Sequence, residues 1–141
     1  LVVYFLRSAI WCPYCAFQLR DLAERGSLIV DSGYNIVTVS YDSIRKLSIY
    51  AKENKFPYPM LSDKGSVVIQ SFDLLNEEYQ PGTTYYGVPH PAIYIIRYDG
   101  LILEKLYKSD LKDRPDVSYV HDAIRRLGDH KAIVEYHEEF D

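Results

Sequence analysis

Short apolar runs divide this chain into strand-like segments. Four of the runs are rich in β-branched and aromatic residues, a composition typical of buried strands. They lie at 1–6, 35–40, 92–98 and 101–107. Asp99 and Gly100 separate the last two runs, and this dipeptide is a strong hairpin signal. The sequence therefore predicts four strands, of which the last two form an antiparallel pair.

Between these runs, apolar residues recur every three or four positions, which is the helical period. Capping and stopping residues mark the ends of three such segments. The expected helices extend from the Cys12–Cys15 segment to near Gly26, from Asp42 or Ser43 to about Asn54, and from Asp116 or Ser118 to Gly128. Strands and helices in this order predict an α/β fold whose sheet has an antiparallel edge.

The middle of the chain is less regular. Its prolines make 56–61 extended, and 62–65 has the composition of a turn. Periodicity does not decide between helix and strand for 66–72. The segment 73–88 is the longest irregular stretch and carries three tyrosines.

Length and composition fit a single domain over 1–141, because 141 residues with 48% hydrophobic content can bury one core. The chain opens inside a predicted strand and without a methionine, so we expect a native N-terminal segment before Leu1. The formal net charge of −4 gives no electrostatic reason to expect nucleic acid or an anionic membrane as partner. No apolar run approaches the length of a membrane span.

Both cysteines of the chain lie in the motif Trp11-Cys12-Pro13-Tyr14-Cys15. The motif is placed where the first strand ends and the first helix begins, so helix N–H groups and the positive end of the helix dipole point at Cys12. This setting favours a thiolate, the species that attacks disulfides and peroxides. Pro13 suits the first helical turn, where its missing N–H is not needed. We interpret the motif as a redox-active dithiol.

Other roles for the cysteine pair fit less well. A zinc site needs a second ligand pair, and the chain has no further cysteine and no suitably spaced histidines. Two buried spectator thiols would have no reason to share one strand–helix junction. A structural disulfide across two residues would close too small a loop to stabilise the fold much. We therefore expect no metal and no cofactor besides the dithiol.

The sequence resembles the thioredoxin-fold redoxins, specifically the alkyl hydroperoxide reductase/thiol-specific antioxidant (AhpC/TSA), or peroxiredoxin-like, family. The motifs that carry the resemblance are Tyr4-Phe5-Leu6-Arg7, Trp11–Cys15, Pro59–Gly65, Gly87–Ile96 and Asp99-Gly100. The resemblance covers nearly the whole chain. It implies a thioredoxin-like three-layer α/β/α fold with a central mixed sheet and a C-terminal antiparallel hairpin.

The same resemblance implies supporting residues around the dithiol. Pro91 matches the family's active-site cis-proline, which faces the C-x-x-C motif across the substrate groove. His90 beside it would stabilise a thiolate if it lies near one, and a solvent-facing histidine is equally consistent with the sequence. Trp11, Pro13 and Tyr14 complete the expected groove.

The chain also departs from typical peroxiredoxins. Those enzymes carry a threonine three residues before the peroxidatic cysteine and an arginine near the start of a later strand. Here Ala9 lies three residues before Cys12, and Cys12 itself lies three residues before Cys15. Pro91 occupies the expected arginine position. Peroxide reduction needs donors that stabilise the departing oxygen, so another residue, such as Arg7, would have to supply them.

Three functions are consistent with these features. The first is thiol–disulfide exchange, with Cys12 as the attacking thiolate and Cys15 as the resolving thiol. The second is hydroperoxide reduction in the manner of peroxiredoxins, with either cysteine as the peroxidatic residue. The third is a non-enzymatic redox-sensing or binding module that uses the tyrosine-rich segment 73–86.

The expected substrates are protein disulfides, low-molecular-weight thiols or hydroperoxides, with thioredoxin or glutathione as the recycling reductant. Either enzymatic function would serve redox homeostasis and antioxidant defence. The dithiol suits a reducing cytosol, which is slightly favoured, or an oxidising compartment. The resemblance is also compatible with a homodimer.

Overall fold

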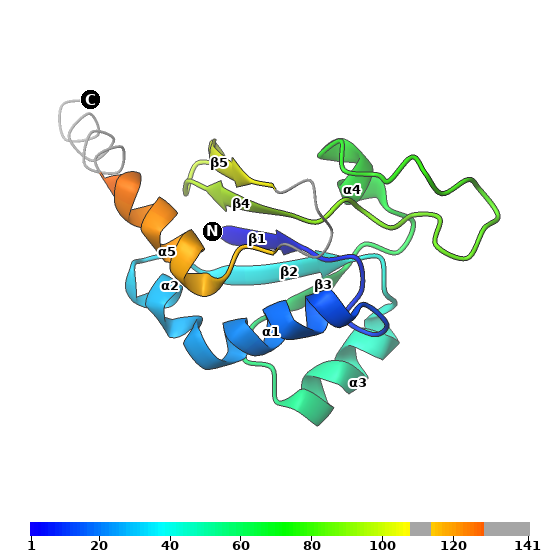
Figure 1. Ribbon diagram of the computed structural model, residues 1–141, viewed down its shortest axis with the longest axis horizontal. Helices are drawn as coiled ribbons and strands as arrows, with labels where there is room; N and C mark the ends of the chain where they lie inside the picture. Colours follow the sequence, from blue (N-terminus) through cyan, green and yellow to red (C-terminus); the bar gives the residue numbers. More distant parts are fainter. Residues whose placement is uncertain (108–113, 129–141) are drawn as a thin grey trace.

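A computed structural model describes residues 1–107 and 114–128, which form a five-stranded mixed sheet with helices on both faces (Figure 1). The elements in chain order are β1 (Val2–Phe5), α1 (Pro13–Arg25), α2 (Ser27–Asp31), β2 (Ile36–Ser40), α3 (Ile44–Asn54), β3 (Met60–Ser62), α4 (Val67–Ser71), β4 (Ala92–Ile96), β5 (Ile102–Leu106) and α5 (Val117–Arg126). The strand order is β3-β2-β1-β4-β5. β1, β2 and β3 are parallel, and β4 and β5 complete the sheet as an antiparallel pair.

β1 lies at the centre of the sheet and separates two hydrophobic cores. Successive side chains of a strand point to opposite faces, so Tyr4 packs into one core and Phe5 into the other. Residues of α1, α2, α3 and α5 contribute to the first core, and residues of α4 and the segment after it contribute to the second. This is the three-layer arrangement that the family resemblance implies, and it places α1 and α5 on the same face.

The predicted elements are confirmed, mostly with shorter bounds. The undecided segment 66–72 contains the helix α4, and 56–61 leads into β3. The segment 73–88 is irregular apart from one isolated bridge between Leu75 and Pro89. Ser43 and Asp116 cap α3 and α5, and α5 ends at Arg126, before the predicted stop. The sequence does not predict α2, because five residues are too few to show a helical period.

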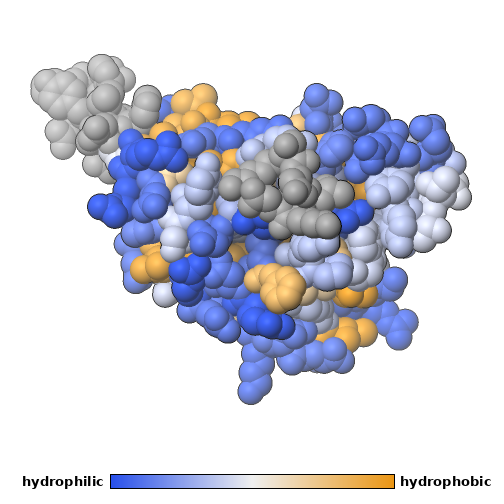
Figure 2. Space-filling model, viewed as in Figure 1, coloured by the Kyte–Doolittle hydropathy of each residue, from blue (hydrophilic) through white to orange (hydrophobic). Residues whose placement is uncertain are grey.

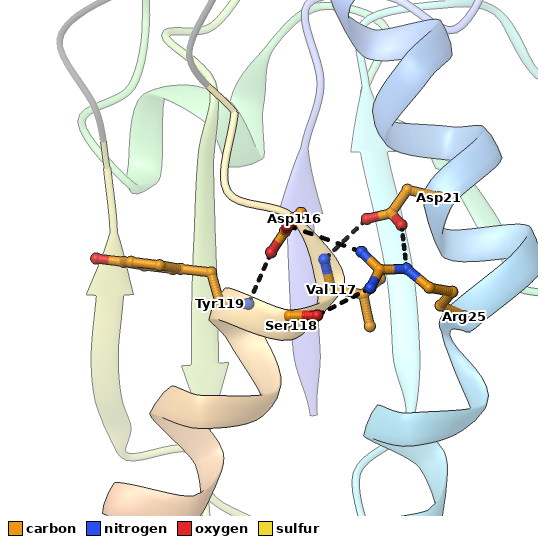
Figure 3. A network of polar contacts seen from close by, with 6 residues as sticks. All are labelled: Asp21, Arg25, Asp116, Val117, Ser118 and Tyr119. Atoms are coloured by element: carbon orange, nitrogen blue, oxygen red, sulfur yellow. Dashed lines mark hydrogen bonds and ion pairs between the residues drawn. The ribbon is translucent and has the colours of Figure 1, made fainter.

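A polar network fastens the start of α5 to α1 (Figure 3). Asp21 of α1 accepts hydrogen bonds from Arg25 Nε at 2.7 Å and from the Val117 N–H at 2.8 Å. Arg25 in turn donates to Ser118 Oγ at 2.8 Å, and its Nη2 lies 3.8 Å from Asp116 Oδ2. The network therefore fixes the residues just before α5 beside the α1 helix.

The surface on the α1 side is mostly hydrophilic (Figure 2). Outside the grey atoms, hydrophobic side chains on this face lie in separate patches rather than in one broad area. No helix among residues 1–107 and 114–128 is long and apolar enough to cross a membrane.

Candidate active site

Cys12 and Cys15 lie in the first turn of α1, as the sequence predicts. Cys12 is the N-cap residue, and its Sγ accepts a hydrogen bond from the Cys15 backbone N–H at 3.4 Å. Pro13 occupies the first turn of the helix, where it needs no hydrogen-bond partner for its nitrogen. Both cysteines are in the free thiol state and buried, with exposed fractions of 2% for Cys12 and 0% for Cys15.

The two thiols have pKa values shifted in opposite directions. The hydrogen bond from the Cys15 thiol, the Cys15 backbone N–H and the positive charge of Arg114 lower the pKa of Cys12 to about 5, although burial opposes them. The hydrogen bond to Cys12, burial and the nearby Cys12 charge raise the pKa of Cys15. The two shifts favour a thiolate on Cys12 and a proton on Cys15.

Arg114 is the residue of the site that the sequence does not predict. Its Nη2 lies 3.9 Å from the Sγ atoms of both Cys12 and Cys15. It reaches them from the segment before α5, about a hundred residues farther along the chain. Its one sequence signal is its place two residues before Asp116, the predicted cap of the last helix. Arg114 thus places a guanidinium at the sulfurs, whereas position 91 holds a proline.

Arg7, the suggested replacement donor, points elsewhere. Its guanidinium lies over the Trp11 ring, 5.0 Å from the centroid, and its Nη2 donates to the Tyr79 hydroxyl at 3.3 Å. These contacts place it in an aromatic cluster rather than at the sulfurs. The structure therefore supports Arg114, and not Arg7, as the arginine of the dithiol.

Trp11 connects the dithiol motif to the tyrosine-rich segment. Its Nε1 donates to the Tyr41 hydroxyl at 3.1 Å, and its ring centroid lies 4.8 Å from that of Tyr85. It also packs against the core that includes Cys12 and Cys15. Trp11 therefore lies between the dithiol motif and the tyrosine-rich segment.

The prediction of a cis bond before Pro91 is wrong. The described residues contain no cis peptide bond. The His90 N–H donates to the Leu74 carbonyl at 2.6 Å, and Pro89 pairs with Leu75. The bond to Pro91 takes the trans form, which is the intrinsically favoured form before proline. Pro91 nevertheless lines a small cavity together with Arg114, so it lies on the dithiol side of the sheet.

His90 does not provide a cation to the thiolate. Its Nε2 lies 2.9 Å from the Glu77 Oε2. His90 is not among the described groups that shift the pKa of Cys12 or of Cys15. Of the two interpretations of this histidine, the structure favours the one without a role at the sulfurs.

Asp42 anchors the loop that presents Cys12. It is buried, and its carboxylate accepts hydrogen bonds from Ser8 Oγ at 2.7 Å, from the Ala9 N–H at 2.9 Å and from Ser40 Oγ at 2.8 Å. Ser8 Oγ then accepts from the N–H groups of the two residues before Cys12. The sequence predicts Asp42 or Ser43 as the helix cap, and Ser43 takes that role.

A cavity of about 310 Å³ lies beside the dithiol, between α1 and the segment before α5. Its lining includes Tyr14, a residue of the expected substrate groove. The other lining residues are Phe17, Gln18, Asp21, Arg114, Pro115 and Asp116. Within 1–107 and 114–128, no group of three His, Cys, Asp or Glu side chains is arranged to hold a metal ion.

Comparison with known proteins agrees with this geometry. The family profile described as "AhpC/TSA family" matches residues 1–105. The chain belongs to the AhpC/TSA family. The match ends before Arg114, so the arginine of the site lies outside the part that defines this membership.

The relatives of this chain carry peroxiredoxin names. The chain is 29% identical to peroxiredoxin Bcp of Escherichia coli over 102 residues, which make up 72% of this chain and 64% of the relative. It is 26% identical to a Haemophilus influenzae protein named as a peroxiredoxin bcp, over 90% of this chain and 79% of the relative. The chain thus spans about two thirds to four fifths of the length of these relatives.

Solved structures support the same fold. Peroxidoxin BcpB from Mycobacterium tuberculosis superposes with a TM-score of 0.70 at 21% identity, over 89% of this chain and 76% of that one. Peroxiredoxin 6 of Arenicola marina superposes with a TM-score of 0.76 at 15% identity, over 90% of this chain and 60% of that one. The predicted thioredoxin-like fold, the AhpC/TSA assignment and the assignment as an oxidoreductase are confirmed.

Proposed function

We propose that this protein reduces hydroperoxides, with Cys12 as the peroxidatic thiolate and Cys15 as the resolving thiol. The observation that carries the proposal is geometric: Cys12 lies at the N-terminus of α1, and an arginine nitrogen lies 3.9 Å from both sulfurs. This setting lowers the pKa of Cys12 to about 5. The peroxiredoxin names of the relatives support hydroperoxides as the substrate class and thiols as the reductant class. We also infer that 1–141 belongs to one domain.

The reaction takes two steps at the sulfurs. The Cys12 thiolate attacks the terminal oxygen of ROOH, so the O–O bond breaks, an S–O bond forms and RO⁻ leaves and takes up a proton. Cys15 then attacks the sulfur of the resulting sulfenic acid, giving the Cys12–Cys15 disulfide and water. The dithiol loses two electrons and the hydroperoxide gains them.

Arg114 is suited to both steps. A guanidinium carries several N–H donors in a fixed plane, so one donor can stabilise the thiolate while another holds a peroxide oxygen. The negative charge moves from sulfur to the departing oxygen during the first step. A fixed cation beside both positions lowers the energy of that transition state.

Burial of the sulfurs favours hydroperoxides over protein disulfides as the oxidising substrate. Cys12 exposes 2% of its surface, which leaves little room for the disulfide of a folded protein to align with its Sγ. A small hydroperoxide needs a far narrower approach. Thiol–disulfide exchange is the second candidate, because adjacent cysteines in one helical turn are also suited to forming and resolving a mixed disulfide. Thioredoxin and glutathione remain our candidates for the recycling reductant.

Steady-state hydroperoxide consumption with dithiothreitol as reductant tests the proposal. The wild type should consume hydroperoxide, and Cys12→Ser should abolish turnover. Cys15→Ser should form a sulfenic acid on Cys12 that a dimedone probe labels. A wild type without hydroperoxide turnover that still reduces protein disulfides would favour the exchange function. Labelling of Cys15 in Cys12→Ser, at least as fast as that of Cys12 in Cys15→Ser, would reverse the two roles.

A further inference from the structure

The tyrosine-rich segment 73–88 contacts the dithiol motif, although the proposed peroxide chemistry gives this segment no role. Its Tyr85 ring packs on the Trp11 ring, with 4.8 Å between the two centroids. Trp11 directly precedes Cys12 in the chain and packs against the core that contains both cysteines. Tyr85 exposes 41% of its surface, whereas Cys12 exposes 2%. The two rings in contact therefore connect a buried sulfur to the molecular surface.

Several contacts hold these rings in place. Trp11 Nε1 donates to the Tyr41 hydroxyl at 3.1 Å. Tyr79 accepts a hydrogen bond from Arg7 and packs on Tyr85, with 5.6 Å between the ring centroids. Electron tunnelling weakens steeply with distance, so rings in contact exchange electrons far faster than widely separated groups. The Arg7 guanidinium over the Trp11 ring disfavours a positive charge there, so Trp11 passes an electron on without remaining oxidised.

We propose that the dithiol also reduces phenoxyl radicals, through the contact between Trp11 and Tyr85. A phenoxyl radical is a one-electron oxidant that is too bulky to reach a sulfur exposed by only 2%. It needs to meet only the exposed phenol of Tyr85, because the electron that reduces it comes from the Cys12 thiolate through Trp11. This activity goes beyond the proposed function, since its substrate has no O–O bond and does not touch the sulfurs.

Electrons and protons balance over two phenoxyl radicals, ArO•. The first ArO• takes an electron and a proton from Tyr85, which gives ArOH and a tyrosyl radical. An electron from the Cys12 thiolate and a proton from water restore Tyr85 and leave a thiyl radical on Cys12. Cys15, in the same helical turn, loses its proton and bonds to this sulfur, which gives a disulfide radical anion. A second ArO• takes the extra electron and a proton, so two ArOH and the Cys12–Cys15 disulfide result.

Pulse radiolysis tests the proposal without any hydroperoxide. Azidyl radicals convert excess N-acetyltyrosinamide into its phenoxyl radical, which then meets the reduced protein in oxygen-free solution. In the wild type, the phenoxyl absorption should decay while the absorption of the disulfide radical anion grows. Tyr85→Phe keeps the ring but removes the oxidisable phenol, so most of this growth should be lost. Tyr98→Phe, in the exposed turn after β4 and at the opposite end of the sheet from the dithiol, is the matched control and should keep the wild-type rate.

Further variants separate electron transfer from a structural role of the rings. Tyr85→Trp supplies another oxidisable ring and should restore the transfer, and Trp11→Phe should abolish it by interrupting the same path. An unchanged rate in Tyr85→Phe overturns the proposal, and so does an equal fall in Tyr98→Phe.

Hydroperoxide turnover with dithiothreitol distinguishes the two activities of the dithiol. Tyr85→Phe should keep the wild-type turnover, because no phenol takes part in that reaction. A loss of hydroperoxide turnover equal to the loss of radical reduction would show that Tyr85 only supports the fold, and would overturn the proposal. A wild type that forms no disulfide radical anion also overturns it, whereas failure of the proposed function is an absence of hydroperoxide turnover.

Discussion

Cys15 stabilises the Cys12 thiolate through two hydrogen bonds, one from its thiol and one from its backbone N–H. The thiol bond is the larger cause of the low Cys12 pKa. Cys15→Ala removes it and should raise that pKa from about 5 towards the ordinary thiol range. Cys15→Ser is the matched variant, because its hydroxyl still donates and should keep more of the shift. The measurement is the rate of Cys12 alkylation against pH, and equal midpoints in the two variants would contradict the assignment.

Arg114 contributes charge to the same sulfur and a donor to the transition state. Arg114→Gln should raise the Cys12 pKa and reduce kcat/KM for hydroperoxide about a hundredfold, as for the loss of one oxyanion donor. Arg114→Lys keeps the charge but lacks the planar guanidinium. It should therefore restore the low Cys12 pKa more fully than it restores kcat/KM for hydroperoxide. Arg45→Gln, on the exposed surface of α3, is the control. The role would be contradicted if kcat/KM fell equally in the glutamine and lysine variants while the Cys12 pKa stayed unchanged in both.

These residues differ in how far the sequence could predict them. Cys12 and Cys15 are local: the strand–helix junction and the adjacent proline are enough to place both thiols at a helix N-terminus. Arg114 is not local, because its approach depends on how α5 packs against α1. No period or motif near Arg114 encodes that packing, and it lies beyond the residues that match the family profile.

At the scale of elements, the loop between β1 and α1 depends on a contact with the end of β2. Asp42 follows β2 and binds the Ser8 hydroxyl and the Ala9 N–H of that loop. In Asp42→Asn one oxygen becomes an NH₂ group, so at least one buried donor loses its acceptor. Such a loss should lower the free energy of unfolding by about 1–3 kcal/mol. Urea unfolding under reducing conditions measures it.

The loop variant should also affect the thiols, since Ser8 Oγ holds the N–H groups just before Cys12. We expect the alkylation midpoint of Cys12 to move in Asp42→Asn. Asp122→Asn, on the exposed face of α5, serves as control and should change neither quantity. Stability and midpoint both equal to the wild type would show that the carboxylate does not anchor the loop.

The elements themselves follow from local patterns where these are long enough. β1 and β4 are apolar on both faces because they are buried on both, and the caps Ser43 and Asp116 begin their helices as predicted. Pro91 shows the opposite case. The family resemblance predicts a cis bond before Pro91, but the bond has the trans form that prolines ordinarily favour.

At the scale of the whole molecule, the site is completed by tertiary assembly. The network of Asp21, Arg25 and the start of α5 holds the Arg114 segment against α1 (Figure 3). Global unfolding therefore separates Arg114 from the sulfurs and returns the Cys12 pKa to its ordinary value of about 8.5. Proton binding at Cys12 and folding of the chain are thus linked.

This linkage predicts how stability depends on pH. The folded pKa of Cys12, about 5, lies below the unfolded one, so the unfolded chain binds more protons between them. The stabilisation by Cys12 is complete above about pH 8.5 and is lost as the pH falls towards the folded pKa. The free energy of unfolding of the wild type should therefore exceed that of Cys12→Ser by more near pH 8 than near pH 5. Cys15 does not obscure the comparison, because its thiol is protonated in both proteins below about pH 8. Urea unfolding with a phosphine reductant at the two pH values checks this, and a difference independent of pH would show that the Cys12 thiolate is not stabilised by the fold.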